Sequence, residues 1–168
     1  MTSSDVRRLD DADEPFAALC AAAARGLAAR NCDLRALVAS DFAERVRDGR
    51  PVFRVAFPST KSDPRGRRRD VRWLDLGPRT AALRRRLSSL SASAPVFPSR
   101  AAVAVPLARI GRTPHGCKRG GMQSVARVAG CRAAGAMGRN ADDSAPVYVE
   151  DADVGAQRAQ LAASRLCL

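Results

Sequence analysis

The amino-acid sequence predicts a mainly helical α+β fold with a small antiparallel β-sheet. After Pro15, apolar residues recur at helical spacing and fall on one face: Phe16, Leu19, Cys20, Ala23 and Leu27. The same spacing recurs at Leu83, Leu87 and Leu90. The period-two placement of Phe53, Val55 and Phe57 instead predicts a strand over residues 50–57. A second strand is predicted over residues 71–76, after a connection rich in turn-forming residues.

Length and composition favour one basic domain. The 168 residues are enough for a single hydrophobic core, although alanine supplies much of the 46% hydrophobic fraction and aromatic residues supply only 4% of the chain. We therefore expect a thin core and modest stability. The net charge is +12, and it comes mainly from arginine, whose guanidinium matches phosphate oxygens. Nucleic acid is the expected partner, but ribosomal and chromatin proteins share this charge, so it predicts no mechanism.

The cysteines lie at positions 20, 32, 117, 131 and 167, without the paired spacing of metal ligands and without a secretory leader before them. Reduced thiols in an intracellular protein are the simplest explanation. The apolar runs are shorter than a membrane span, so we expect a soluble protein with no membrane partner. No carboxylate or His/Cys cluster indicates a metal, and we expect no cofactor.

Start and stop signals assign the segments of the first half. Residues 1–13 are polar and are expected to form a frayed lead before a helix that starts near Asp13 or Pro15. Residues 58–70 are predicted to form the basic tip of a hairpin. This tip contains Lys61 and four arginines: Arg65, Arg67, Arg68 and Arg69. We interpret the arginines as a nonspecific DNA-phosphate clamp or as a run resembling a nuclear-import signal.

The second half is predicted to be helical with interruptions. A loop over residues 88–98 separates two helices, and Pro106 is expected to kink or break the second of them. A further helix should end at Gly130, with a short helix after it. Residues 151–168 are predicted to form an amphipathic tail helix that packs on its own domain or on a neighbour's.

The stretch from Thr113 to Gln123 concentrates the chemistry of the chain and contains its only histidine. Thr113 followed by Pro114 predicts the N-terminus of a helix. His115 and Lys118, three residues apart, would then share one face of the first turn. The backbone amides of that turn, which lack partners within the helix, and the two cations would form an anion-binding site. The alternative is a basic helix start with a solvated imidazole.

Two segments of the first half resemble signature motifs of the tyrosine recombinases, the phage-integrase family. Residues 28–42 resemble the first box of that family, in which an arginine precedes an acidic residue, a leucine-rich helix and a Ser-Asp-hydrophobic exit into a strand. On this match Arg30 is the first catalytic arginine and Asp33 is its acidic neighbour. An arginine that caps a helix end is the alternative. Residues 60–62 resemble the hairpin motif, whose lysine, here Lys61, protonates the leaving oxygen.

The candidate residues follow the order in which the family presents its arginine, hairpin lysine, His-x-x-Arg box and nucleophilic tyrosine: Arg30, Lys61, His115, Lys118 and Tyr148. The resemblance covers about residues 14–150 and implies an integrase-like DNA breaking-rejoining catalytic domain over that range. The family's N-terminal core-binding domain, which clamps DNA, is expected to be absent, because only a short polar lead precedes the first helix.

The resemblance implies double-stranded DNA as the substrate and no cofactor. The phenol of Tyr148 would attack a backbone phosphorus, giving a 3′-phosphotyrosyl link and a free 5′-hydroxyl, and reversal would rejoin the strands. Cationic side chains would stabilise charge on the phosphate oxygens, and the imidazole would help to deprotonate a phenol whose reference pKa is about 10. This predicts DNA recombination or integration, for example by a mobile element, in a nucleus or nucleoid, with the tail available for homo-oligomer contacts on DNA.

Two positions depart from the family pattern. The second arginine should stand three residues after His115, where this chain has Lys118, with Arg119 one residue further on. Lysine keeps the charge but lacks the bidentate fork, and Arg119 is turned by about 100° around a helix. The third box, His or Trp in the family, falls on Arg139 or Asn140. Asn140 can still donate a hydrogen bond to a phosphate oxygen.

The sequence also allows two other functions. A catalytically inactive DNA-binding remnant would keep the basic face while Tyr148 stays idle. The other is a basic RNA-associated or partly disordered protein, unrelated to recombinases, and a folded core over about residues 14–150 would favour the recombinase-like domain over it.

Overall fold

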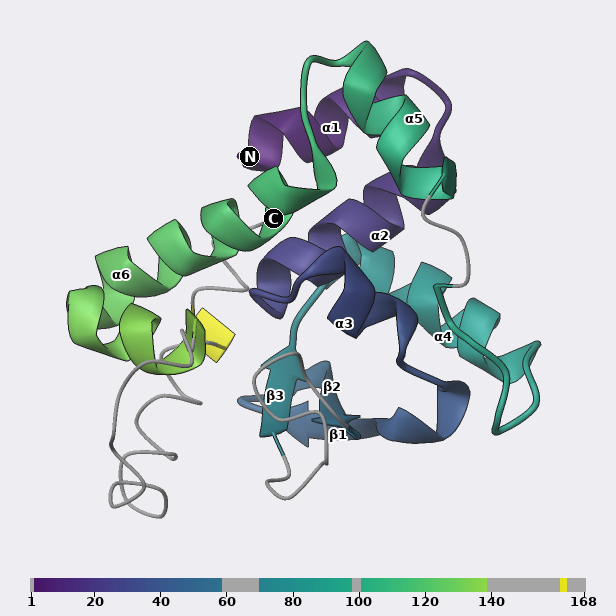
Figure 1. Cartoon of the computed structure of the whole chain (residues 1–168). Coiled ribbons are helices and arrows are strands. Elements are labelled where there is room, and N and C mark those ends of the chain that lie inside the picture. The colour runs from purple at the N-terminus through teal and green to yellow at the C-terminus, as the bar shows by residue number, and fades with distance from the viewer. Residues whose placement is uncertain (1, 59–69, 98–100, 139–160, 163–168) are drawn as a thin grey trace.

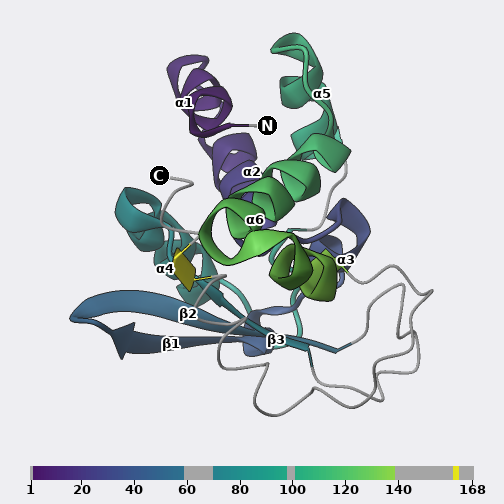
Figure 2. The same ribbon diagram turned by 90° about the vertical axis from the view of Figure 1, so that its left-hand side faces the viewer.

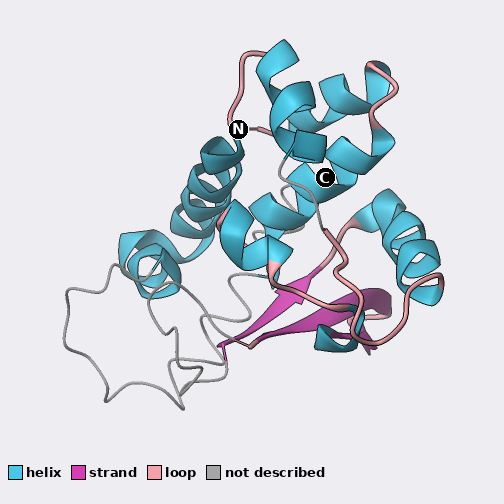
Figure 3. Cartoon of the chain, turned by 45° about the vertical axis from the view of Figure 1, so that its right-hand side comes forward, coloured by secondary structure: helices cyan, strands magenta, loops and turns pink. Residues whose placement is uncertain are grey.

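The computed structural model describes residues 2–58, 70–97, 101–138 and 161–162, and it gives only the helix, without side chains, for residues 129–138. The helices are α1 (Ser3–Asp11), α2 (Pro15–Gly26), α3 (Asn31–Arg35), α4 (Thr80–Ser88), α5 (Ala101–Arg109) and α6 (Pro114–Gly138). The strands are β1 (Phe42–Arg47), β2 (Arg50–Phe57) and β3 (Asp70–Leu74). The prediction of a mainly helical α+β fold with a small antiparallel sheet is confirmed (Figures 1 and 3).

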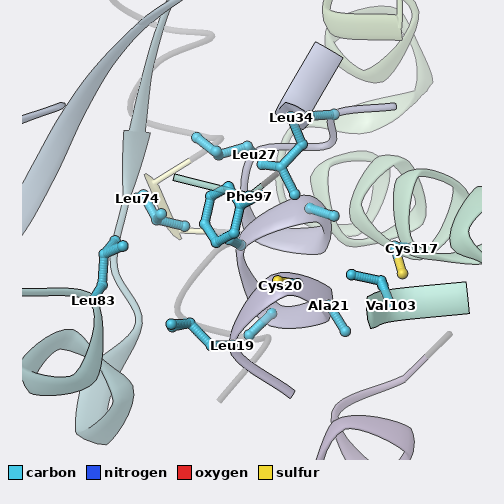
Figure 4. Close-up of a cluster of buried hydrophobic side chains, with 14 of the residues drawn as sticks. Leu19, Cys20, Ala21, Leu27, Leu34, Leu74, Leu83, Phe97, Val103 and Cys117 are labelled. Atoms are coloured by element: carbon cyan, nitrogen blue, oxygen red, sulfur yellow. The ribbon is translucent and has the colours of Figure 1, made fainter. Parts of the chain in front are cut away.

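Helix α2 lies at the centre of the hydrophobic core and begins at Pro15, as predicted. All residues from Ala17 to Gly26 are buried, and the helix contacts α1, α5 and α6. Figure 4 shows it between two groups of apolar side chains: Leu74, Leu83 and Phe97 on one side, Val103 and Cys117 on the other. The predicted single apolar face is therefore too narrow. Alanines on the remaining faces let neighbouring helices approach closely, so the whole helix is buried.

The sheet has the strand order β1-β2-β3 and is antiparallel throughout. Strand β2 covers the range predicted from alternation, and β3 overlaps the predicted second strand. Strand β1 is the strand that the resemblance implied after the Ser-Asp-hydrophobic exit. Phe53, Val55 and Leu74 point from one face into the core beneath the helices, which lie on this side of the sheet (Figure 2). The opposite face carries Val52 and Trp73.

A second, small hydrophobic cluster on that outer face consists of Val52, Trp73 and Leu161. Leu161 is 4% exposed, and the Arg47 guanidinium lies 3.7 Å from the centroid of the Trp73 ring. At Leu161 the tail therefore packs on its own domain, one of the two predicted alternatives. The rest of the predicted tail helix lies outside the described residues.

The N-terminal segment is a helix, so the expected frayed lead over residues 1–13 is wrong for residues 3–11. Val6 and Leu9 of α1 are buried against the core. A capping box starts the helix, because the Thr2 hydroxyl accepts from the Asp5 amide while the Asp5 carboxylate accepts from the Thr2 amide at 2.7 Å. Arg112 also donates to Asp5 at 2.9 Å, tying α1 to the segment before α6. Two apolar residues in a polar stretch gave too weak a periodicity to predict this helix.

The Asp5 carboxylate should make the docking of α1 sensitive to acid. Burial alone would raise its pKa, but the Thr2 amide and the Arg112 guanidinium outweigh burial and hold the pKa of Asp5 below its usual value. Because the folded pKa is the lower one, this stabilisation is present above about pH 4 and is lost as the pH falls through the folded pKa. Asp5→Asn should therefore lower the free energy of unfolding by about 2 kcal/mol at pH 7.

Denaturant titrations of the original protein and of Asp5→Asn at pH 7 and pH 3 measure this effect. The difference in the free energy of unfolding between the two proteins should be smaller at pH 3. An equal difference at both pH values would show that ionisation of Asp5 does not stabilise the fold.

Helices α4 and α5 follow the predicted order, whereas α6 is longer than predicted. Helix α5 continues through Pro106, so of the two expected effects of this proline, a kink or a break, the break is wrong. Helix α6 is continuous through Gly130, so the predicted C-cap there is also wrong. A glycine in a helix interior costs only about 1 kcal/mol relative to alanine, and the helix-forming alanines after it outweigh this local signal.

Candidate active site

The turn that ends α2 directs the chain into Arg30. The Ala28 amide donates to the carbonyl of Arg25 and the Ala29 amide to that of Ala24, the two bonds of a Schellman motif. Ala28 has φ 47°, the left-handed conformation that this motif requires at that position. Arg30, with extended backbone, is the residue before the first turn of α3. It therefore lies between the end of α2 and the start of α3, and this position leaves the alternative of an arginine that caps a helix end open.

Ala28→Gly should stabilise the protein by about 0.5–1 kcal/mol, because glycine adopts the left-handed conformation without strain from a Cβ. Ala29→Gly is the matched control: Ala29 has no positive φ, so the same change there should destabilise the protein by a similar amount. Thermal unfolding of the two variants should shift the midpoint in opposite directions. A loss of stability in both would argue against the left-handed turn before Arg30.

The Arg30 guanidinium lies at the surface beside a carboxylate. Its Nη1 is 4.0 Å from Oδ2 of Asp33, and the two side chains are 25% and 12% exposed. The start of α3 thus holds an arginine beside an acidic residue. At 4.0 Å this half-buried pair adds little stability, so its main effect is to limit the positions that the guanidinium can take.

Helix α6 crosses the same turn at Gly121. A Cβ built on Gly121 would lie 2.1 Å from the Arg25 carbonyl oxygen and 3.0 Å from Cα of Ala28. Only glycine therefore permits this approach. Helix α6 also contacts α3, and Figures 1 and 2 show α6 running across α2 with α3 beside it. Lys118 precedes Gly121 by three residues and so lies on the same side of α6, toward Arg30.

Lys118 belongs to a cluster of charges at this crossing. It is half-buried. Partial burial and the positive charges of Arg30 and Arg72 lower the pKa of Lys118 below its usual value, while Asp33 opposes this shift. We call Arg30, Arg72 and Lys118 the cation cluster. Two predicted site residues from distant parts of the sequence, Arg30 and Lys118, therefore lie on helices that contact each other and are close enough for their charges to interact.

Arg72 is the member of the cluster that the sequence did not reveal as a site residue. In the sheet it pairs with Val55, whose side chain points into the core, so Arg72 faces inward as well. It donates to the carbonyl oxygens of Leu27 at 2.5 Å and Ala28 at 3.3 Å, and it forms an ion pair with Asp70 at 2.6 Å. The signal available in the sequence was its spacing from Leu74, because residues two apart in a strand share one face of the sheet.

The beginning of α6 matches the sequence prediction. The helix starts at Pro114, and the Thr113 hydroxyl accepts from the amide of Gly116 at 3.3 Å, as expected of an N-cap. His115 is exposed, so the alternative of a solvated imidazole stays open. Arg119 is also exposed, and one residue beyond Lys118 it is turned by about 100° around the helix. The cluster therefore contains Lys118, and Arg119 faces another direction.

The other predicted site residues lie outside the described residues: Lys61, Arg65, Arg67, Arg68, Arg69, Arg139, Asn140 and Tyr148. The connection that contains the first five leaves β2 after Phe57 and enters β3 at Asp70, and these two residues pair with each other in the sheet. Because Asp70 is the ion-pair partner of Arg72, this connection begins and ends at the edge of the cation cluster.

Two of the described cysteines, Cys20 and Cys117, are buried, and a third, Cys32, is exposed. Burial raises the pKa of Cys20 to about 12 and that of Cys117 to about 11. Such thiols stay protonated and unreactive near neutral pH. Among the residues described, no group of three His, Cys, Asp or Glu side chains could hold a metal ion. In the same residues, no helix has the length and apolar character needed to cross a membrane.

Comparison with known proteins adds no relative: no family model, no curated protein and no solved structure matches this chain.

Proposed function

We propose that this protein binds double-stranded DNA at the cation cluster and cuts and rejoins it as a tyrosine recombinase does, through a 3′-phosphotyrosyl link to Tyr148. The observation that carries the proposal is the convergence of Arg30 and Lys118. Helices α3 and α6 contact each other, Arg30 lies beside the carboxylate of Asp33, and the charge of Arg30 acts on Lys118. An anionic ligand shared by the two cations would be favoured at this contact.

The charges of the cluster suit a phosphodiester. Three cations and two carboxylates, Asp33 and Asp70, leave the site with a net charge of +1 (3 − 2), before His115 and Arg119 on α6 are considered. Two cations directed at the non-bridging oxygens would stabilise the charge that develops there during attack by a phenolate. Burial, followed by the charges of Arg30 and Arg72, lowers the pKa of Lys118. A phosphate oxygen bound beside these cations would favour the charged form of Lys118.

A second candidate function is a DNA-binding protein that has lost catalysis. The specific observation in its favour is the second-arginine position, where Lys118 lies in the cluster while Arg119 is exposed on another face of α6. An ammonium can hold a phosphate but cannot bind two of its oxygens as a guanidinium does. Such a remnant would retain affinity for DNA without forming a covalent link.

Covalent trapping distinguishes the two candidates. Nicked DNA duplexes of randomised sequence release a short fragment after cleavage, so a protein-DNA adduct cannot be reversed and survives denaturing electrophoresis. Recombinase activity predicts an adduct that disappears in Tyr148→Phe, whereas Tyr148→Phe should bind DNA as tightly as the original protein. Adduct formation in neither protein, with binding that weakens steeply as salt increases, would support the remnant. Preferential binding of an RNA duplex in competition would overturn both and favour an RNA-associated protein.

A further inference from the structure

Arg72 makes an unusual set of contacts for a strand residue. Its guanidinium forms four hydrogen bonds: two to Asp70, from Nε at 3.2 Å and from Nη2 at 2.6 Å, and two from Nη1 to the carbonyl oxygens of Leu27 and Ala28. Its Cζ lies 4.9 Å from the centroid of the Phe57 ring. The side chain is only 11% exposed. The guanidinium therefore joins the base of the β2–β3 connection to the end of α2.

The position in the sheet makes an arginine unexpected. Arg72 faces the same side as Val55 and Leu74, two residues that are fully buried in the core. An apolar side chain would fit there at no electrostatic cost, whereas a buried ion pair is stabilising only when its geometry satisfies nearly every donor. An arginine at this position therefore calls for a reason beyond core packing. The two carbonyl oxygens that it reaches provide that reason.

Those carbonyls belong to the turn that delivers Arg30. Leu27 is the C-cap residue that follows α2, and the chain continues through the left-handed Ala28 and then through Ala29 to Arg30. Carbonyl groups at a helix end lack partners within the helix, and a cation near them also interacts favourably with the helix dipole. By bonding both carbonyls, Arg72 fixes the turn relative to the sheet. Without it, the strained conformation of Ala28 would relax more readily, and Arg30 would move with it.

We infer that Arg72 is a positioning residue that holds Arg30 at the cation cluster and couples it to the base of the β2–β3 connection. Its donors are directed at Asp70 and at the two carbonyls, so it acts through Arg30 and does not itself bind phosphate. The expected effect of Arg72 on DNA cleavage rests on the proposed function. Its effect on the turn between α2 and α3 does not depend on that function.

Amide hydrogen exchange tests the control of the turn without DNA. Arg72→Met keeps the length of the side chain and removes every donor, and Arg72→Lys keeps the charge with a single ammonium that cannot reach both partners. Arg54→Met is the matched control, since Arg54 pairs with Trp73 in the same sheet and points to the outer face. In both Arg72 variants the amides of Ala28 and Ala29 should exchange at least about 10-fold faster, with little change in α5. A uniform increase in all helices, or no change at the turn, would overturn the inference.

A double-mutant cycle with Arg30 separates positioning from a general loss of stability. If Arg72 acts through Arg30, Arg72→Met should slow adduct formation about 10-fold in the original protein and less than about 2-fold when Arg30 is already glutamine. Additive losses would overturn the inference and leave the proposed function standing. If the original protein neither binds nor cuts DNA, the proposed function fails, and the exchange pattern alone then decides whether Arg72 controls the turn.

Discussion

Gly121→Ala is expected to destabilise the protein by about 3 kcal/mol, although alanine is the better helix former by about 1 kcal/mol. The new Cβ would lie 2.1 Å from the Arg25 carbonyl oxygen, a backbone atom that cannot rotate away. To relieve this steric clash, α6 must move away from α2. Because Lys118 lies three residues earlier on the same side of α6, this movement would also separate Lys118 from Arg30. DNA affinity should therefore fall even under conditions in which the variant remains folded.

Denaturant unfolding of Gly121→Ala and of Gln123→Ala measures the stability effect. Gln123 is exposed on the same helix, so alanine there should leave the free energy of unfolding within about 0.5 kcal/mol of the original value. If Gly121→Ala proved more stable than the original protein, α6 could not cross α2 as closely as the structure shows.

Lys118→Arg is expected to accelerate adduct formation on nicked DNA by about 10-fold to 100-fold. The ammonium of Lys118 can hold one phosphate oxygen, whereas a guanidinium can bind two in parallel and matches the charge that develops in the transition state. Helix α6 already directs this side chain toward Arg30, so the substitution changes the donor and keeps its place. The gain should appear mainly in the rate at saturating DNA, because binding of the ground state requires only the charge.

Arg119→Gln is the control for that prediction. Arg119 is exposed and faces another direction on α6, so its loss should weaken DNA binding only slightly and change the rate of adduct formation less than about 3-fold. The opposite pattern, with Lys118→Arg silent and Arg119→Gln inactive, would show that α6 rotates on DNA and that Arg119 is the second catalytic arginine.

The parts of the fold predicted from the sequence are those with strong local signals. Alternation alone located β2, and the Thr113-Pro114 pair located the first residue of α6. Helix α1 was missed because it is stabilised by long-range contacts, among them the ion pair between Asp5 and Arg112. Such long-range contacts do not affect the local spacing of apolar residues, from which helices are predicted.

The site was predictable only as a set of candidates. Motif order identified Arg30 and Lys118, but their proximity depends on Gly121, whose role is a close approach to α2 that one sequence cannot reveal. Arg72 was missed for a related reason. A charged residue within a strand is ordinarily assigned to solvent, and only the pairing of β3 with β2 shows that this one faces the core.

The most direct test of the account is to observe the cation cluster during DNA binding. In NMR spectra of the protein titrated with a short duplex, the side-chain signals of Arg30 and Lys118 should shift together with DNA concentration, while those of Arg54 on the outer face should change little. The combined replacement of Arg30 and Lys118 by glutamine should abolish the remaining shifts around the crossing of α2 and α6. If DNA instead shifted only signals remote from this crossing, and the double replacement left affinity unchanged, the cluster would not be the phosphate site and the recombinase proposal would fail.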